Sequence, residues 1–214
     1  MPVRRFFRWL SKLLSRKRNL KIGLVGAPNS GKTTLANRIC MEWCGEKMGE
    51  VSGMPHETRV VQSKNHVEVK SEGFSIIVDL FDTPGLSTHE ELWDYYRHFL
   101  WSGLDAHSAD KRLEEARKGI AKTLALLNDL DALVLVLDLS KDPSKQISDI
   151  LLDILAKRHI PLIIAANKMD LVEGLPPADD YTFLGYPVVP ISALDGLNME
   201  RLYKAMYRHL KKQV

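Results

Sequence analysis

The most constraining feature of this chain is a glycine-containing pattern close to its N-terminal end. Residues 26–33 read G-x-x-x-x-G-K-T, a short apolar run (22–25) precedes them, and a helix-like stretch (35–43) follows. A strand, a glycine loop and a helix N-terminus in this order gather backbone N–H groups around a phosphate, with the positive end of the helix dipole behind it. The residues predicted to hold a nucleotide phosphate are Gly26, Ala27, Pro28, Asn29, Ser30, Gly31, Lys32, Thr33 and Thr34.

Two side chains of this pattern carry charges and oxygen atoms that phosphates require. Lys32 would neutralise oxygens of the β- and γ-phosphates, and the Thr33 hydroxyl would bind the Mg²⁺ ion that bridges them. The alternative is an incidental glycine loop in an α/β domain, which the flanking strand and helix argue against. The pattern therefore predicts a nucleotide bound together with Mg²⁺.

A second motif indicates which base is recognised. Asn167, Lys168 and Asp170 stand in the sequence N-K-M-D directly after an apolar run at 161–166, at the carboxyl end of a predicted strand. A carboxylate there can accept hydrogen bonds from both N1–H and N2–H of guanine, whereas adenine offers no matching pair of donors. With ATP the carboxylate would stay unpaired, at a cost of several kcal/mol by order of magnitude. We therefore expect guanine rather than adenine.

The third motif, D-T-P-G at residues 82–85, closes another apolar run at 75–81. Asp82 at this strand end can hold Mg²⁺ through water, and the Gly85 N–H can reach the γ-phosphate. Strands that alternate with helices predict an α/β fold of three layers, with a mostly parallel sheet, helices on both faces and ligands at the carboxyl ends of the strands.

Taken in this order, the motifs resemble those of the translation-factor class of small GTPases, and more closely the Era-like and TrmE-like branch. The resemblance covers roughly residues 20–212. It rests on segments 26–33, 55–59 (P-H-E-T-R), 82–85, 167–170 and 192–194 (S-A-L). It implies a Ras-like P-loop GTPase domain that hydrolyses GTP to GDP and acts as a molecular switch.

The resemblance also assigns roles to residues that the spacing alone does not. Thr58 would contact Mg²⁺ and the γ-phosphate only in the GTP state, so the implied metal ligands are Thr33, Thr58 and Asp82. Lys32, Thr58 and Gly85 form the implied catalytic set. The backbone N–H of Ala193, between Ser192 and Leu194, would donate to guanine O6.

Two positions bear on the rate of hydrolysis. Leu86 stands where Ras-like proteins carry a glutamine that orients water, and leucine has no hydrogen-bonding group, so slow intrinsic turnover is expected. Asn29 matches an asparagine that in TrmE-like relatives helps to hold a K⁺ ion in place of an arginine finger. The alternative is that Asn29 only braces the loop.

Era continues into an RNA-binding KH domain, whereas no G-x-x-G loop of that kind follows in this chain. This departure weakens the expectation of an Era-like ribosomal role. Two alternatives to a membrane-recruited switch stay open at this point. One is an Era-like ribosome-assembly or RNA-associated GTPase whose basic tail replaces the KH domain; the other is a GTP-dependent scaffold whose hydrolysis is incidental.

The charge of the chain is unevenly distributed. The net charge is +3, but residues 1–18 hold seven Lys or Arg and no acid, so residues 19–214 carry 23 basic and 27 acidic side chains, a net of −4. We therefore divide the chain into a basic segment (1–18) and a GTPase domain (19–214). Cys40 and Cys44 lie four residues apart on a predicted helix, which favours reduced thiols and a cytoplasmic protein.

Residues 3–18 form an amphipathic pattern. When they are wound as a helix, the apolar side chains fall within an arc of about 160° and cations fill most of the rest. The apolar set is Val3, Phe6, Phe7, Trp9, Leu10, Leu13 and Leu14. Such a helix suits an anionic membrane surface, here the inner face of the membrane. RNA binding, packing on this or another protein, and a targeting peptide are the alternatives, and no small-residue cleavage site follows.

The segment after Gly85 is longer than the family usually has, so switch II is expected to be enlarged at about residues 86–108. Its helical stretch, 90–101, holds five aromatic residues: Trp93, Tyr95, Tyr96, Phe99 and Trp101. These side chains would either cover part of the core or form the surface that an unidentified protein effector recognises.

The remaining elements are predicted from periodicity and turn residues. Strands are expected at 60–69, 74–81, 132–138, 161–166 and 187–191, and helices at 109–129, 145–158 and 199–211. Residues 45–59 read as an irregular switch that orders around the γ-phosphate.

Overall fold

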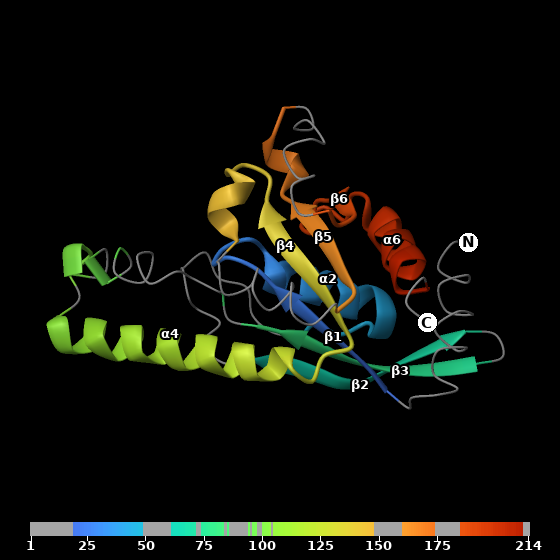
Figure 1. The fold of residues 1–214 in the computed structure, drawn as a ribbon, viewed down its shortest axis with the longest axis horizontal. Helices are drawn as coiled ribbons and strands as arrows, with labels where there is room; N and C mark the ends of the chain where they lie inside the picture. Colours follow the sequence, from blue (N-terminus) through green and yellow to red (C-terminus); the bar gives the residue numbers. More distant parts are fainter. Residues whose placement is uncertain are drawn as a thin grey trace.

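A single six-stranded sheet runs through the centre of the domain (Figure 1). The structure is a computed structural model that describes residues 19–48, 61–71, 74–83, 85, 94, 96–97, 100–103, 105–147, 160–173 and 185–211. The strands are β1 (Asn19–Val25), β2 (Gln62–Ser71), β3 (Phe74–Asp82), β4 (Ala132–Asp138), β5 (Leu162–Asn167) and β6 (Val188–Pro190). They lie side by side in the order β2-β3-β1-β4-β5-β6.

Only β2 runs antiparallel to its neighbour, and every other pairing in the sheet is parallel. The parallel strands therefore bring their carboxyl ends to one edge, where Leu24 lies opposite Asp82 and Asp138 lies opposite Asn167. This edge is the place where open α/β sheets bind ligands. Two residues singled out from the sequence, Asp82 and Asn167, end their strands there.

Helices cover both faces of the sheet. They are α2 (Lys32–Cys44), α4 (Ala106–Leu127) and α6 (Met199–Lys211), with short 3-10 helices η1 (Pro143–Gln146) and η2 (Met169–Leu171). Figure 1 shows α2 and α6 on one side and α4 on the other. The fold predicted from the sequence, a three-layer α/β domain with a mostly parallel sheet, is confirmed.

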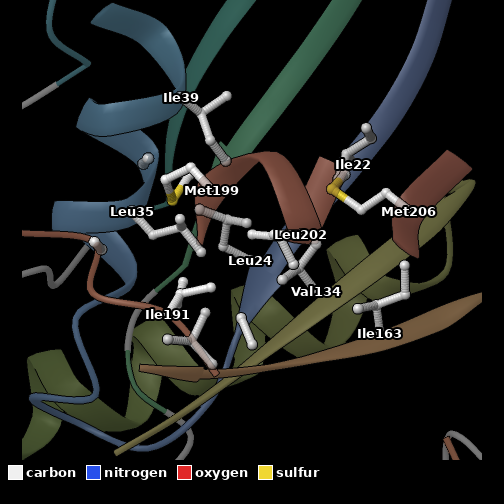
Figure 2. Close-up of a cluster of buried hydrophobic side chains, with 14 of the residues drawn as sticks. Ile22, Leu24, Leu35, Ile39, Val134, Ile163, Ile191, Met199, Leu202 and Met206 are labelled. Carbon is white, nitrogen blue, oxygen red and sulfur yellow. The ribbon is translucent and has the colours of Figure 1, made fainter. Parts of the chain in front are cut away.

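The two faces follow from the alternation of side chains along the strands. In β4, Val134 and Val136 join the cluster under α2 and α6, whereas Leu133, Leu135 and Leu137 join the cluster on the α4 side. Figure 2 shows the first cluster, in which side chains of α2 and α6 meet those of the central strands. Because all seven residues of β4 are buried, this strand lies at the centre of the domain.

Helix α4 is long and lies along one edge of Figure 1, so that its N-terminal half extends beyond the sheet. It begins at Asp105, whose side chain accepts a hydrogen bond from the Ser108 N–H, as N-cap residues do. Its buried residues recur at intervals of three or four, as expected for one apolar face. They are Ala109, Leu113, Ala116, Gly119, Thr123 and Leu127.

Apart from the start of the helix predicted at 145–158, the predicted elements agree in type with the structure over the described residues and differ at their ends. The helix expected at 35–43 begins earlier, at Lys32, and the helix expected at 109–129 covers 106–127. Of the helix expected at 145–158, residues 143–146 form η1, and 148–159 lie outside the described residues. Cys40 and Cys44 are free thiols on α2, and the Cys44 Sγ donates to the Cys40 carbonyl at 3.0 Å.

The structure describes five residues of the predicted 90–101 helix, and all five are helical. Tyr96 packs against Leu113 and Ala116 of α4, whereas the side chain of Trp101 is 89% exposed. Trp93, Tyr95 and Phe99 lie outside the described residues. Within the described part of the chain, no helix has both the length and the apolarity needed to cross a bilayer.

Candidate functional site

The glycine loop between β1 and α2 has a backbone that only certain residues adopt. Gly26 (φ 147°), Asn29 (φ 59°) and Gly31 (φ 93°) all have positive φ, which glycine and asparagine tolerate best. A Cβ on Gly26 would come within 2.2 Å of the Val136 carbonyl oxygen, and one on Gly31 within 2.2 Å of Asn167 Nδ2. The two glycines of the pattern are therefore required by close packing against β4 and β5.

Lys32 begins α2 and is buried, with 5% of its surface exposed. Its ammonium group donates hydrogen bonds to the carbonyl oxygens of Gly26 at 3.2 Å and Ala27 at 2.8 Å. Burial lowers the pKa of Lys32 from 10.5 to about 8, and the nearby Asp82 carboxylate opposes this shift. The cation is thus held at the inner side of the loop, where a phosphate would neutralise it.

The predicted metal ligands Thr33 and Asp82 lie next to each other. The Thr33 hydroxyl donates to Asp82 Oδ2 at 2.6 Å, which joins the start of α2 to the end of β3. Asp82 Oδ1 is buried and accepts no hydrogen bond from any described residue. Burial raises the pKa of Asp82, and the Thr33 hydroxyl and the Lys32 charge act against it.

These donors fit Mg²⁺. A hydroxyl and a carboxylate are the hard oxygen ligands that this ion prefers, and it retains several waters when protein side chains hold it. The unpaired Oδ1 of Asp82 is an acceptor that a metal-bound water would satisfy. Thr58, the third predicted ligand, lies outside the described residues.

Gly85 lies against the glycine loop. A Cβ on this residue would stand 2.6 Å from the Pro28 nitrogen and 2.8 Å from the Pro28 Cα, so the two backbones touch. Nearby, the buried Thr83 hydroxyl donates to the Leu24 carbonyl at 2.8 Å, which fixes the start of this segment to β1. The glycine of D-T-P-G therefore lies at the glycine loop, and the contact of its N–H with a γ-phosphate stays a prediction.

Asn167 connects the glycine loop to the loop at 192–194. Its Nδ2 donates to the Ser30 carbonyl at 2.9 Å, and its Oδ1 accepts from the Ala193 N–H at 2.9 Å. The side chain is 3% exposed. Residues 30, 167 and 193, which are far apart in sequence, thus meet through one amide.

Lys168 has a partner that the sequence analysis did not find. Its ammonium group pairs with Asp138 Oδ2 at 2.7 Å, at the end of the neighbouring strand β4. Asp138 Oδ1 also accepts from the N–H and hydroxyl of Ser140. Burial acts to raise the pKa of Asp138, but the bonds from Lys168 and Ser140 hold that pKa below its ordinary value. An aspartate at a strand end, two residues before a serine, was the available signal.

Asp170 and the loop at 192–194 form the more open side of the site. Asp170 lies in η2 with its side chain exposed. Ser192 is buried, and its hydroxyl accepts a hydrogen bond from the Asp195 N–H at 3.1 Å, which closes the turn. Leu194 is 68% exposed. This side of the site therefore offers one exposed carboxylate and a buried turn whose backbone is held in place.

Arg38 was also missed. It lies on α2, four residues beyond Thr34, and its guanidinium donates to the carbonyl oxygens of Ala193 at 3.1 Å and of Leu194. No local motif marks this arginine, because its partners lie more than 150 residues away. Of the other predicted residues, Asn29 is exposed at the tip of the loop, and Thr34 lies partly buried in the first turn of α2.

Sequence comparisons identify proteins that are similar to this chain. Residues 21–168 match the family described as 50S ribosome-binding GTPase. The chain is 31% identical over 195 residues to GTPase Era of Trichlorobacter lovleyi, which covers 88% of this chain and 54% of that protein. It is 32% identical over 193 residues to the tRNA modification GTPase MnmE of a Thermotoga species, which covers 89% of this chain and 36% of that protein.

Two solved Era structures have the same fold. An Era variant from Aquifex aeolicus bound to GDP.AlF4- matches with a TM-score of 0.57 at 23% identity, over 90% of this chain and 57% of that one. Era with MgGDPNP and a segment of 16S ribosomal RNA matches with a TM-score of 0.53 at 21% identity, over the same two shares. This chain thus spans about half the length, or less, of the proteins that it resembles.

Proposed function

This chain belongs to the 50S ribosome-binding GTPase family, and from that premise we propose that it binds GTP with Mg²⁺, hydrolyses it slowly to GDP and acts as a molecular switch. The observation that carries the proposal is the cluster of Lys32, Thr33 and Asp82 beneath the glycine loop. It combines a buried cation, which bonds to carbonyl oxygens of the loop, with a hydroxyl that donates to a carboxylate whose second oxygen is unpaired. Such a set suits a polyphosphate and a hard cation together.

Each residue of the cluster would contribute a separate part of the chemistry. Lys32 would exchange its bonds to the Gly26 and Ala27 carbonyls for bonds to β- and γ-phosphate oxygens, where its charge stabilises the transition state. Mg²⁺ supplies neutralisation of the charge that develops between these two phosphates. Thr33, Asp82 and Thr58 would hold it, and the Gly85 N–H would donate to the γ-phosphate.

The base would be recognised at the carboxyl end of β5. Asp170 would accept from guanine N1–H and N2–H, and the Ala193 N–H, which now donates to Asn167, would be shared with guanine O6. Lys168, held by Asp138, would place its aliphatic stem beside the base. Adenine would leave the Asp170 carboxylate without a hydrogen-bond donor, which supports GTP rather than ATP as the substrate.

Turnover by the isolated protein is proposed to be slow and to respond to K⁺. Leu86 cannot orient a water molecule, so the added rate would depend on a cation held by Asn29. Single-turnover hydrolysis in K⁺ and in Na⁺ tests this. Asn29→Gly is the better variant than Asn29→Ala, because φ at this residue is 59° and glycine removes the side chain without strain.

We expect a faster rate in K⁺ for the wild type and no K⁺ response for Asn29→Gly. Asn65→Gly, an exposed position in β2, serves as the control and keeps the response. If Asn29→Gly keeps the K⁺ response, Asn29 is only a brace of the loop. If the wild type does not hydrolyse GTP in either cation, hydrolysis is not its activity.

Residues 3–18, which lie outside the described part, are proposed to bring the domain to an anionic membrane surface on the cytoplasmic side. The support is the amphipathic pattern of this segment and its seven cations, beside a domain of net charge −4. Binding to anionic vesicles should weaken with salt, because counterions screen the cations over roughly one Debye length.

A pair of charge-matched variants separates the apolar from the electrostatic contribution. Phe6→Asp with Leu10→Asp should abolish vesicle binding at low salt, because the apolar face can no longer be buried. Ser11→Asp with Ser15→Asp adds the same charge on the polar face and should only weaken binding. If a protein lacking residues 1–18 binds vesicles equally well, the segment is not the anchor.

An RNA-associated role is the second candidate, and the family description together with the RNA-bound Era structure favours it. In that case the full-length protein would sediment with ribosomal subunits and protect RNA, and it would not bind lipid.

An effector would dock on switch II, where Trp101 is 89% exposed. Binding of that effector should differ between the GDP-bound and GTP-bound protein if the chain is a switch.

A further inference from the structure

Arg38 bridges two parts of the site that the motifs treat as separate. It belongs to α2, the helix that starts at the phosphate loop, and its guanidinium donates hydrogen bonds to the loop at 192–194. The acceptors are the carbonyl oxygens of Ala193 and Leu194, two consecutive peptide groups. A planar guanidinium presents its donors to two acceptors in a rigid fork, whereas the donors of an ammonium group rotate on a flexible stem.

Ala193 is held from both sides as a result. Its N–H donates to Asn167 Oδ1 at 2.9 Å, and its carbonyl oxygen accepts from Arg38 Nε at 3.1 Å. Ala193 itself is 1% exposed. The peptide group before the Ala193 Cα is therefore held by a side chain of β5, and the peptide group after it by a side chain of α2, so Arg38 acts on the Ala193 N–H through the adjoining peptide.

The loop is also shaped to admit the guanidinium. Gly196 has a φ of 78°, and a Cβ at this position would lie 3.3 Å from Arg38 Cζ. Any larger residue there would have to displace the arginine or distort the turn. The Gly196 N–H donates to the Ser192 carbonyl at 2.8 Å, so the turn that admits Arg38 is the turn that presents Ala193.

From this geometry we propose that Arg38 is a positioning residue for base recognition, which aims the Ala193 N–H at the 6-oxo group of the purine. The proposal rests on the proposed function, in which that N–H donates to guanine O6. Arg38 itself does not touch the nucleotide. It acts through the backbone of residues 193–194, and it links the position of that backbone to the helix behind the phosphate loop.

The test compares nucleotides that differ at one edge of the base. In 6-thioguanosine diphosphate the oxygen at C6 is replaced by sulfur, a weaker acceptor, whereas inosine diphosphate lacks the N2 amino group that Asp170 would bind. Affinities are measured by competition against a fluorescent GDP analogue. For the wild type we expect GDP to bind more tightly than either analogue, by about two- to tenfold for the weakened bond at C6.

In Arg38→Ala the ratio of affinities for GDP and 6-thioguanosine diphosphate should fall towards one, while the ratio for GDP and inosine diphosphate should keep its wild-type value. Arg38→Lys keeps the positive charge but lacks the planar guanidinium, so we expect a ratio of affinities for GDP and 6-thioguanosine diphosphate between those of the wild type and Arg38→Ala. If Arg38→Ala fails to fold, as circular dichroism would show, Arg38→Lys carries the test. Arg201→Ala, an exposed position on α6, is the matched control and should leave both ratios unchanged.

The other outcomes are distinct. Both ratios unchanged in Arg38→Ala, or both reduced by the same factor, would overturn the proposal, because a merely structural role predicts no selective loss at C6. A wild type that binds GDP and its 6-thio analogue equally would overturn it as well. A wild type that binds no guanine nucleotide at all would instead refute the proposed function.

Discussion

The phosphate side and the base side of this site are built differently. On the phosphate side, Lys32 and Asp82 are buried side chains that bond within the protein. On the base side, Asp170 is exposed and Ala193 contributes only its backbone, which Asn167 and Arg38 hold in place. In the proposed site, buried charges would supply affinity for any polyphosphate, whereas a backbone held in place and one carboxylate would supply the choice of base. Substitutions on the two sides should therefore fail in different ways.

The largest effect is expected from Lys32→Ala. It removes the only cation that the described residues place under the glycine loop, so affinity for GDP and GTP should fall together by about 2–3 kcal/mol, or roughly 30- to 150-fold. Titration calorimetry measures both affinities. Lys111→Ala, exposed on α4, is the control and should bind normally. Unchanged affinity in Lys32→Ala would mean that the glycine loop does not hold the phosphates.

Asp170→Asn should alter the choice of base and leave the phosphate side intact. GTP binding should weaken by about 2 kcal/mol, because the amide carries a donor NH₂ group in place of one of the two accepting oxygens of the carboxylate. Xanthosine triphosphate should gain, since its oxygen at C2 accepts from the new amide. The same calorimetry measures both, with Asp129→Asn, an exposed position just beyond α4, as the control. A parallel loss for the two nucleotides would contradict the assigned contact.

Asp138→Asn tests the ion pair between Asp138 and Lys168. It should lower the free energy of unfolding by about 1–2 kcal/mol at pH 7, because it leaves that ammonium group without its anionic partner. The folded-state pKa of Asp138 is depressed, so the stabilisation is present above the unfolded pKa, about 3.9, and is lost as the pH falls through the folded value. Thermal unfolding should therefore show the difference between wild type and variant shrinking below about pH 4. A constant difference across this range would exclude the ion pair as its cause.

The smallest effect is expected from Leu194→Ala. Its side chain is 68% exposed, and only its carbonyl group is used, as an acceptor for Arg38. Stability should change by no more than about 0.5 kcal/mol, and GDP affinity by less than about twofold. Titration calorimetry measures the GDP affinity of Leu194→Ala, and the affinity of Arg38→Ala measured in the same way provides the comparison. A large loss in Leu194→Ala would mean that the base side depends on side chains after all.

The sequence allowed the order of strands and helices, the glycine loop and the candidate site residues at the ends of β3 and β5 to be predicted, because each of these features has a local pattern. Arg38, and the pairing of Asp138 with Lys168, could not be predicted in this way. Asp138 meets Lys168 only because β4 lies beside β5, and Arg38 meets Ala193 only because α2 packs near the final turn before α6. Contacts that depend on the packing of distant elements produce no local sequence pattern from which they could be predicted.

The contact between Gly85 and Pro28 belongs to the same class. The motif predicted that Gly85 would face a phosphate, but it did not predict the close approach to Pro28. A Cβ on Gly85 would stand 2.6 Å from the Pro28 nitrogen, and this approach follows from the pairing of β1 with β3.

Thr58, Leu86 and residues 3–18 lie outside the described residues, so their roles stay predictions. The hairpin strands β2 and β3 were expected, whereas the ends of α2 and α4 differed from their expected positions by up to three residues.

The most direct test of nucleotide recognition at this site is calorimetric titration of the wild-type protein with GTP and with ATP, each with and without Mg²⁺. We expect tight binding of GTP that weakens when Mg²⁺ is removed, and binding of ATP that is weaker by several kcal/mol, since Asp170 would stay unpaired. Equal affinity for the two nucleotides, or binding of neither, would contradict the assignment of a guanine-specific, Mg²⁺-dependent site.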